Sequence, residues 1–477
     1  MTPHRGLKLS PRQYQILELL SKGLTNKEIC RLLSISSNTV KAHVASILQI
    51  LEVTNRTEAA MVFRNKTEDI ENLQPQSSLK IKPKHLIAVL PFSDLTENAE
   101  YRNLSQGLAE DLITRLVAWR FFPVFSSEFF RGITPDSFDG EMPGLSGVDY
   151  LVTGSVRKSE ADLHISYRVT ENSTNRTILS ECFHIKLDSA VKVQDIISLK
   201  ISAAVIPLLI ENEGRRTEYM LSSEMDSWYN TMRGYYLLKK RTRKAALDAQ
   251  FCFENAIEID SMSAPGWHGL TLCYYRAYTE DEIDDRGAIV KTINTTARQC
   301  LSVDNKNALG YHCVGMSKMI SGALNEACVY FDKAIDLNPG FSDAYMLKGQ
   351  IYAMLDRTDD AISVLDYAKS LCPDLMTNGI NLGSIALLHF AQCNYKEAIE
   401  CAEQCLNMIP GNIFASALLA SSYAHLGEIS EAKRVANELV CKYPGFHIEN
   451  LSPLLRSVNQ NHASRFIKGL VDSGAIR

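Results

Sequence analysis

The sequence TNKEICRLLSISSNTVKAHVASILQIL, residues 25–51, predicts a helix, a tight turn and a second helix. Thr25 and Glu28 have the three-residue spacing of a capping box, which places the start of the first helix near Asn26. Ser36 can cap the second helix. The apolar residues of this second helix recur at a spacing that puts them on one face: Val40, Val44, Ile47, Leu48 and Leu51. The stretch is therefore predicted to be a helix-turn-helix with one buried face.

The opposite face of the second helix is made of small, polar and cationic side chains. It consists of Asn38, Ala42, Ala45 and Gln49, flanked by Lys41, Thr39 and His43. A helix face of this size and charge can enter the major groove of DNA. The alternative interpretation is a small helical hairpin whose Lys and His side chains are solvated.

The chain from Leu9 to about Val62 resembles the DNA-binding domain of LuxR-type transcriptional regulators, the GerE family. The segments that carry the resemblance occur in the family's order and spacing: LSPR at 9–12, GLTNKEI at 23–29, IS at 35–36, TVKAH at 39–43 and NRTEA at 55–59. The resemblance implies base reading by Lys41, Ala42 and Ala45, and contacts to the DNA backbone by Thr39, His43 and neighbouring basic side chains. The full set of predicted DNA-binding residues is Lys27, Asn38, Thr39, Lys41, Ala42, His43, Ala45, Gln49 and Arg56.

The resemblance leads to two further expectations, one on base readout and one on dimerisation. Alanine can contact only a thymine methyl group, so direct readout by Ala42 and Ala45 should be thin and DNA shape should contribute more. The helix from Asn55 to Phe63 is the dimer contact in the family, which implies a homodimer on two half-sites. Packing of that helix within its own domain is the alternative.

The charge of the chain is distributed unevenly. A length of 477 residues predicts about three domains, and the net charge is −5. Residues 1–66, called the head below, contain ten Lys and Arg against four Asp and Glu, a net charge of +6. The rest of the chain has a net charge of −11. A basic head on an acidic remainder suits a DNA-binding module whose other domains do not touch the phosphates.

Apolar runs and cysteines bound the class of protein. The longest apolar run, residues 201–210, contains Pro207 and is far shorter than the ~20 residues of a membrane span, so no transmembrane helix is predicted. No apolar signal-peptide core occurs near the N-terminus, which predicts a cytoplasmic protein. Ten of the twelve cysteines lie between Cys252 and Cys441 at positions typical of small buried residues. No zinc-ligand spacing emerges, so reduced, buried thiols are predicted, with no metal and no other cofactor.

The middle of the chain alternates strand and helix patterns. Residues 67–84 are polar, contain Pro75 and Pro83, and are predicted to be a linker. Residues 85–215 are predicted to form an α/β or α+β domain with one sheet and a few helices. Strands are expected at 85–92, 122–126, 150–158, 163–170 and 177–185, and helices at 101–119 and 189–209.

The middle region resembles the TolB-amino-terminal-like domain, which often accompanies helical repeats. The matching segments are IAVLPFSDL at 87–95, GLAEDLI at 107–113 and GVDYLVTGSVR at 147–157. This resemblance implies no chemistry for these residues. Glu110 and Asp111 are adjacent on a predicted helix and point about 100° apart, so they are interpreted as a solvated helix edge rather than a catalytic pair. The Gly-rich stretch 140–147 lacks the spacing and the Lys of a phosphate loop.

The sequence repeats itself from about Asp226. Four prolines recur at spacings of 34, 37 and 34 residues, and an alanine stands twelve residues before each: Pro339, Pro373, Pro410 and Pro444, with Ala327, Ala361, Ala398 and Ala432. The pattern resembles tetratricopeptide repeats, and predicts about six of them over 226–447 with a C-terminal capping helix in 448–477. Such arrays form a concave groove that commonly holds a peptide or helix, so a protein or peptide partner is predicted there. A structural or dimerising spacer is the alternative.

These features predict a multidomain, mainly α protein with a four-helix LuxR-type helix-turn-helix, an α/β middle domain and a C-terminal α-solenoid. The predicted function is a DNA-binding transcriptional regulator that reads promoter DNA and is controlled by, or recruits, a protein partner. A repeat-based scaffold with little sequence-specific DNA binding is one alternative. An enzyme is another, because TolB-like and repeat modules also follow cyclase-type catalytic domains. No paired-Asp metal site, nucleophile motif or phosphate loop appears, so no enzymatic activity is predicted.

Overall fold

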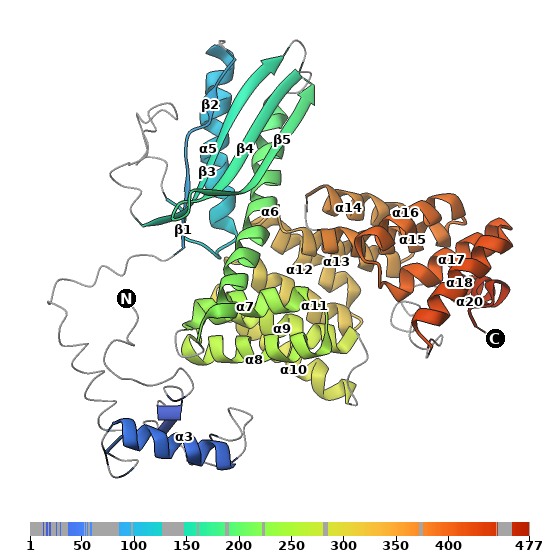
Figure 1. Ribbon diagram of the computed structural model, residues 1–477. Coiled ribbons are helices and arrows are strands. Elements are labelled where there is room, and N and C mark those ends of the chain that lie inside the picture. Colours follow the sequence, from blue (N-terminus) through green and yellow to red (C-terminus); the bar gives the residue numbers. More distant parts are fainter. Residues whose placement is uncertain are drawn as a thin grey trace. The chain divides into compact units, whose positions relative to one another are not determined.

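The structure is a computed structural model of the chain. It describes individual residues between 13 and 59, including the whole of helix 37–50, and residues 85–96, 99–125, 147–159, 162–186, 190–221, 225–279, 285–371, 375–444, 446 and 460–476. The chain divides into two compact units, Met1–Lys82 and Pro83–Arg477, called the first and second unit below. Helices dominate the described residues, which confirms the mainly α prediction (Figure 1). The predicted linker at 67–84 lies outside the described residues.

The first unit has a small apolar core built around helix α3, Ser37–Ile50. Residues from each of the predicted helices contribute to it, and all are at most 2 % exposed: Ile16, Leu17, Leu20, Ile29, Val40, Ile47 and Ala59. Because these residues stand at the apolar positions expected from helical periodicity, the core of the helix-turn-helix follows directly from the sequence pattern. Leu32 and Leu33, in the first helix of the predicted helix-turn-helix, lie outside the described residues.

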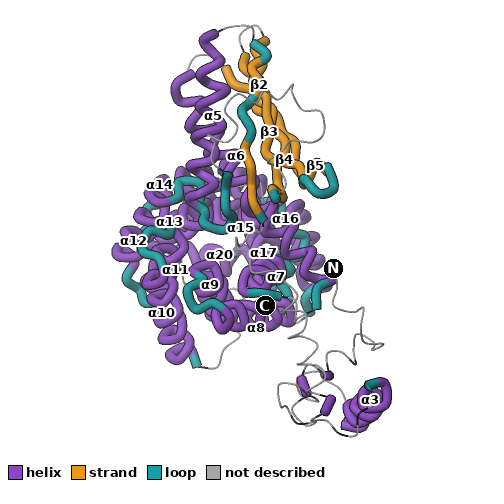
Figure 2. The backbone as a smooth tube through the Cα atoms, turned by 90° about the vertical axis from the view of Figure 1, so that its left-hand side faces the viewer, coloured by secondary structure: helices purple, strands orange, loops and turns teal. Residues whose placement is uncertain are grey.

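The second unit begins with a mixed sheet. Its strands are β1 (Leu86–Val89), β2 (Ser93–Asp94), β3 (Val148–Ser159), β4 (Asp162–Glu171) and β5 (Arg176–Lys186). The order is β1-β3-β4-β5, with β2 also paired to β3. β1 and β2 run parallel to β3, whereas β3, β4 and β5 form an antiparallel meander. Helices α5 (Ala99–Ala118) and α6 (Ala190–Arg216) lie on one side of the strands (Figure 2).

The strand expected at 122–126 is not formed as predicted. Val124 forms only an isolated parallel bridge with Ile87, and residue 126 lies outside the described residues. The bridge uses two hydrogen bonds, from the Ile87 N–H to the Pro123 carbonyl at 2.9 Å and from the Phe125 N–H to the Ile87 carbonyl at 2.8 Å. Pro123 has no N–H to donate, which prevents a longer ladder at this position.

Side chains alternate between the two faces of β4. Leu163, Ile165, Tyr167 and Val169 are at most 1 % exposed and belong to the core beneath α5 and α6. The residues between them point to the opposite face, as successive strand residues must. Over β4 and β5 that opposite face is half-buried or exposed, so this part of the sheet has one covered and one open side.

Helix α6 is the longest helix described and runs seven residues past its predicted end at residue 209. Pro207 lies inside it. The segment Val193–Tyr219 is long and apolar enough to cross a membrane by length and composition, and 61 % of its most apolar window is buried inside the structure. Ile201, Val205 and Leu209 are completely buried. The helix therefore serves as a core element of the second unit.

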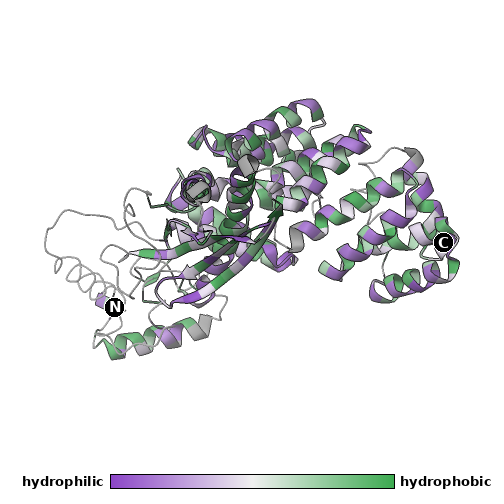
Figure 3. Cartoon of the chain, turned by 90° about the horizontal axis from the view of Figure 1, so that it is seen from above, coloured by the Kyte–Doolittle hydropathy of each residue, from purple (hydrophilic) through white to green (hydrophobic). Residues whose placement is uncertain are grey.

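The remaining described helices pair in sequence order. They are α7 (Ser227–Lys239), α8 (Arg243–Ile259), α9 (Ala264–Thr279), α10 (Arg286–Val303), α11 (Ala308–Ile320), α12 (Leu324–Leu337), α13 (Ser342–Met354), α14 (Thr358–Leu371), α15 (Leu375–Ala391), α16 (Tyr395–Met408), α17 (Ile413–Leu426), α18 (Ile429–Lys442) and α20 (Gln460–Ser473). Hydrophobic and hydrophilic residues share each helix, so each pair buries one side against its neighbours (Figure 3).

The periodic small residues lie where the helices of a pair touch. The four alanines that precede the prolines are all completely buried: Ala327, Ala361, Ala398 and Ala432. A Cβ atom on Gly315 would lie 2.6 Å from the Phe331 ring, and one on Gly349 would lie 2.7 Å from the Leu365 side chain. The close approach of the two helices therefore requires small residues at these places, as the repeat pattern predicts.

The sheet and the first repeats share one continuous hydrophobic core. It extends from Ile87 in β1 to Ile351 in α13. Trp228 on α7 stacks on His85, with ring centroids 3.6 Å apart and an angle of 8° between the rings. Its indole N–H donates to the Phe121 carbonyl at 3.2 Å. The middle region and the repeats, predicted as separate domains, are thus packed together in the second unit.

The cysteine prediction is correct for some thiols and wrong for others. Cys252, Cys273 and Cys300 are buried, and burial raises the pKa of Cys252 to about 11 and that of Cys273 to about 12. Cys393 and Cys441 are exposed, which contradicts the expectation of buried thiols. Cys393 lies in the turn after α15 with a positive φ of 65°, and Cys441 lies in the last turn of α18, on its solvent side.

Candidate nucleic-acid interface

Helix α3 has a buried face. Val40 and Ile47 are completely buried, and Val44, Leu48 and Leu51 pack against the same core. The helix spans 14 residues and contains no acidic side chain. Burial of this face holds α3 in one rotation about its axis, so the solvent-facing side is determined by packing.

The solvent-facing side of α3 contains most of the predicted DNA-binding residues. Lys41, Ala45 and Gln49 are exposed and His43 is half-buried, at spacings that put Lys41, Ala45 and Gln49 on adjacent turns. The side chains of three further predicted residues on α3 are not among those described: Asn38, Thr39 and Ala42. The remaining predicted residues, Lys27 and Arg56, lie outside the described residues.

Two hydrogen-bonded contacts support α3 and the following turn. The Gln13 side-chain amide donates to the Ser46 hydroxyl at 2.8 Å, which ties the segment before the predicted helix-turn-helix to α3. The Glu58 N–H donates to the Asn55 side chain at 2.9 Å, and the Asn55 amide donates to the Glu58 carboxylate at 2.8 Å. This reciprocal pair caps the helical turn that the sequence places at Asn55.

Sequence reasoning identified the start at Asn55 but missed both supporting contacts. The spacing of Asn55 and Glu58 is itself a capping signal, so it was available in the sequence. The Gln13–Ser46 contact joins residues 33 positions apart, and no local pattern points to it. The half-buried polar side chain of Gln13 is a weak sign of such a contact.

The arrangement of α3 can present a cationic, sterically small surface to a polyanion. Lysine offers three donors to phosphate or to guanine O6 and N7, glutamine can bind adenine in bidentate geometry, and alanine admits a thymine methyl. A helix of 14 residues is roughly 21 Å long and about 10 Å wide, which fits the ≈ 12 Å major groove.

A second group of side chains lies in the second unit. Among the described residues, His164, Cys182 and His184 bring three possible metal-ligand atoms within 4.8 Å of one another. Sequence reasoning missed this group because it looked for Cys and His pairs at zinc-finger-like spacing, which these three residues do not have. The available signal was Cys182 and His184, two residues apart on one predicted strand, and His164 on the predicted strand before it.

Two segments match known families. Residues 7–63 match the family described as bacterial regulatory proteins, luxR family, and residues 330–363 match a tetratricopeptide repeat family. These matches confirm the resemblances predicted for the head and for the repeats. The TolB-amino-terminal-like resemblance stays a prediction.

Curated relatives match parts of the chain. It is 52 % identical over 66 residues to "Putative HTH-type transcriptional regulator YhjB" of Escherichia coli (strain K12), covering 13 % of this chain and 33 % of the relative. It is 24 % identical over 260 residues to "Putative adenylate cyclase 3" of Rhizobium meliloti (strain 1021), covering 53 % of this chain and 43 % of the relative. The chain thus spans less than half the length of both relatives. The solved structure of a thermophilic TPR protein of Thermus thermophilus is 16 % identical with a TM-score of 0.34, covering 41 % of this chain and 98 % of that chain.

Proposed function

We propose that this chain is a DNA-binding transcriptional regulator whose head reads promoter DNA through α3. The observation that carries the proposal is the solvent-facing side of α3, where Lys41, Ala45 and Gln49 are exposed and no acidic residue occurs, inside a segment that matches the luxR family. The net charge of +6 on the head supports binding to phosphates. Lys27, Asn38, Thr39, Ala42, His43 and Arg56 complete the proposed contact set.

The proposed DNA complex is a dimer on two half-sites. The helix from Asn55 to Phe63 supplies the dimer contact, as the family resemblance implies. Two copies of α3 would then enter successive major grooves about one helical turn apart. Because two of the three proposed base readers are alanines, affinity rests mainly on phosphate contacts and DNA shape.

We further propose that the repeats bind a protein or peptide partner in their concave groove and so control the regulator. The tetratricopeptide match supports a protein-binding role. The net charge of −11 outside the head would repel DNA, which argues against an extension of the DNA contact by the repeats. Since the repeats share their core with α6 and the sheet, a partner bound to the repeats acts on the whole second unit.

The proposal places the protein in the cytoplasm and assigns it no catalytic activity. The match to the cyclase-named relative is longer than the head, so most of it falls outside residues 1–66. That match leaves more than half of the relative uncovered.

The substitution Lys41→Ala in the full-length protein tests the proposed function. If Lys41 contacts a guanine, the binding free energy for promoter DNA should weaken by about 1–3 kcal/mol. If Lys41 contacts a phosphate, the negative slope of log affinity against log salt should become less steep by about 0.9. Fluorescence anisotropy across a salt series measures both quantities.

The matched control is Lys244→Ala, which removes the same charge from an exposed position on α8. It should leave DNA affinity and salt slope unchanged. Equal effects of the two substitutions, or a wild-type affinity that does not depend on salt, would remove α3 as the DNA-reading element.

A further inference from the structure

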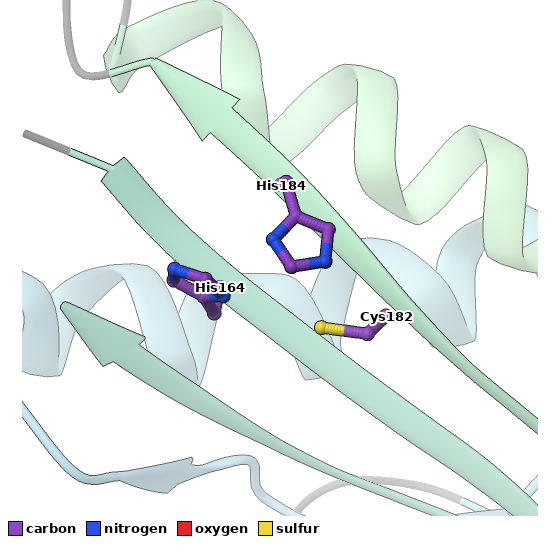
Figure 4. A group of neighbouring side chains, drawn as sticks. All are labelled: His164, Cys182 and His184. Atoms are coloured by element: carbon purple, nitrogen blue, oxygen red, sulfur yellow. The ribbon is translucent and has the colours of Figure 1, made fainter. Parts of the chain in front are cut away.

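Three side chains that prefer transition metals converge on the open face of the sheet. His164 lies on β4, and Cys182 and His184 lie on the neighbouring strand β5 (Figure 4). The register places His164 directly opposite His184, and Cys182 opposite Ser166, two pairs further along. Because residues two apart on a strand share a face, Cys182 and His184 project to the same side as His164. This side faces away from the core that buries Leu163 and Ile165.

The distances suit a single bound ion. The ligand atoms of the three side chains lie within 4.8 Å of one another, and the two imidazole rings are 4.5 Å apart between centroids at an angle of 81°. In a tetrahedral zinc site, metal–ligand bonds of about 2.0–2.3 Å put ligand atoms about 3.5 Å apart. Cys182 and His184 are exposed and His164 is half-buried, so small side-chain rotations can close the difference while the strand ladder holds the backbone.

We propose that His164, Cys182 and His184 bind Zn²⁺, with water as the fourth ligand. Imidazole nitrogen and thiolate sulfur are the donors that zinc prefers, whereas Ca²⁺ and Mg²⁺ require oxygen ligands. The Cys182 thiol forms no disulfide, and its Sγ lies 3.9 Å from the Phe183 carbonyl oxygen. Neither that contact nor the ring-on-ring packing of the histidines competes strongly with a metal ion.

Charged residues of both signs share this face of the sheet, since Asp162 of β4 is paired with Lys186 of β5. Arg157 on β3 lies opposite His164 on the same face and is exposed, so its long side chain can extend into solvent. Asp162 precedes His164 by two residues and therefore adds a carboxylate to the same face. A thiolate on Cys182 contributes a further negative charge once the ion binds.

The position of the site gives it a structural consequence. It lies near the open end of the β4–β5 hairpin, far from the turn at residues 172–175, and two residues before the end of β5 at Lys186. Helix α6 begins shortly after, at Ala190, and enters the core shared with the repeats. A bound ion would therefore join the strand that leads to α6 to its neighbour. Its exposure allows exchange with solvent, unlike a closed structural zinc site with four protein ligands.

Titration of the full-length, tag-free protein with Co²⁺ and then Zn²⁺ tests the proposal. Co²⁺ bound through a thiolate should produce a sulfur-to-metal charge-transfer band at one equivalent, and Zn²⁺ should abolish the band. The substitution Cys182→Ser should remove the band, and His164→Gln or His184→Gln should weaken Zn²⁺ binding in competition with a chromophoric chelator. Since loss of an outer partner alone costs about 10–100-fold, loss of a ligand should cost on the order of 100-fold.

The matched control is Cys441→Ser, which removes another exposed thiol on α18. It should keep the band and the zinc affinity of the wild type. Metal-free melting curves followed by circular dichroism should be alike for all variants, because the substituted side chains are exposed or half-buried. A wild-type protein without the band, a band that survives Cys182→Ser, or a zinc affinity unchanged by both His164→Gln and His184→Gln would overturn the site.

Discussion

The substitution Gly269→Ala offers a direct measurement of how tightly the first repeats are packed. Gly269 on α9 faces the ring of Phe253 on α8, and Phe253 is completely buried. A Cβ atom at residue 269 would lie 2.1 Å from Cε1 and 2.2 Å from Cζ of that ring. The favourable separation between carbon atoms is about 3.5–4.0 Å, so the added methyl overlaps the ring by about 1.5 Å.

The Phe253 ring has no free side to which it can move. A Cβ atom on Gly234, on α7, would lie 2.6 Å from Cζ of the same ring. Two glycines on two helices thus enclose one aromatic side chain. Overpacking of this kind costs about 1–3 kcal/mol, and the better helix propensity of alanine returns up to about 1 kcal/mol. With the full offset, the expected net loss in the free energy of unfolding is up to about 2 kcal/mol.

Urea unfolding followed by tryptophan fluorescence measures this loss. All three tryptophans of the chain lie in the second unit, and Trp267 packs against the Phe253 cluster. Gly287→Ala is the matched control, since this helical glycine is exposed and a Cβ there meets only Asp285 Oδ1 at 3.3 Å. It should change the free energy of unfolding by less than about 1 kcal/mol, since only a side-chain oxygen is near and the position is in the first turn of α10. If Gly269→Ala is as stable as Gly287→Ala, the close packing of α7, α8 and α9 is refuted.

Two further predictions concern the division of the chain and its response to acid. A cut within residues 67–84 should leave an N-terminal fragment that binds promoter DNA like the full chain in mobility-shift assays but has lost or unlocked transcriptional control. An N-terminal fragment that regulates normally would make the repeats a spacer. The cut is placed there because a cut at Asp226 would expose the core that α6 shares with the repeats. Burial lowers the pKa of His312 to about 3 and that of His268 well below its usual 6.5. Between the lowered pKa of each histidine and pH 6.5, its imidazole is therefore protonated in the unfolded chain but neutral in the folded one. The free energy of unfolding should therefore fall below pH 6.5 by about 1.4 kcal/mol per pH unit for each histidine. Urea midpoints at pH 7 and pH 5 should show a smaller drop for His312→Leu than for the wild type, and an equal drop would contradict this assignment.

Short-range patterns in the sequence were sufficient to predict much of the fold and one face of the candidate site. The apolar spacing of Val40 and Ile47 identified the buried face of α3, and the periodic position of Ala361 identified a helix contact. Both predictions succeed because a helix repeats every 3.6 residues, so the sequence spacing alone states which side chains share a face. The extra length of α6 beyond residue 209 was missed, because the apolar pattern gives way to the polar residues ENEGRR at 211–216.

Only the tertiary structure decided which distant residues meet. Periodicity shows that Cys182 and His184 share a face, but the strand register decides that His164 lies opposite them. The stacking of His85 on Trp228 likewise joins residues far apart in the chain and merges two regions predicted as separate domains. Local spacing determines the direction of a side chain relative to its own helix or strand. The neighbour it meets depends on strand register and helix packing, which arise from contacts across the whole unit.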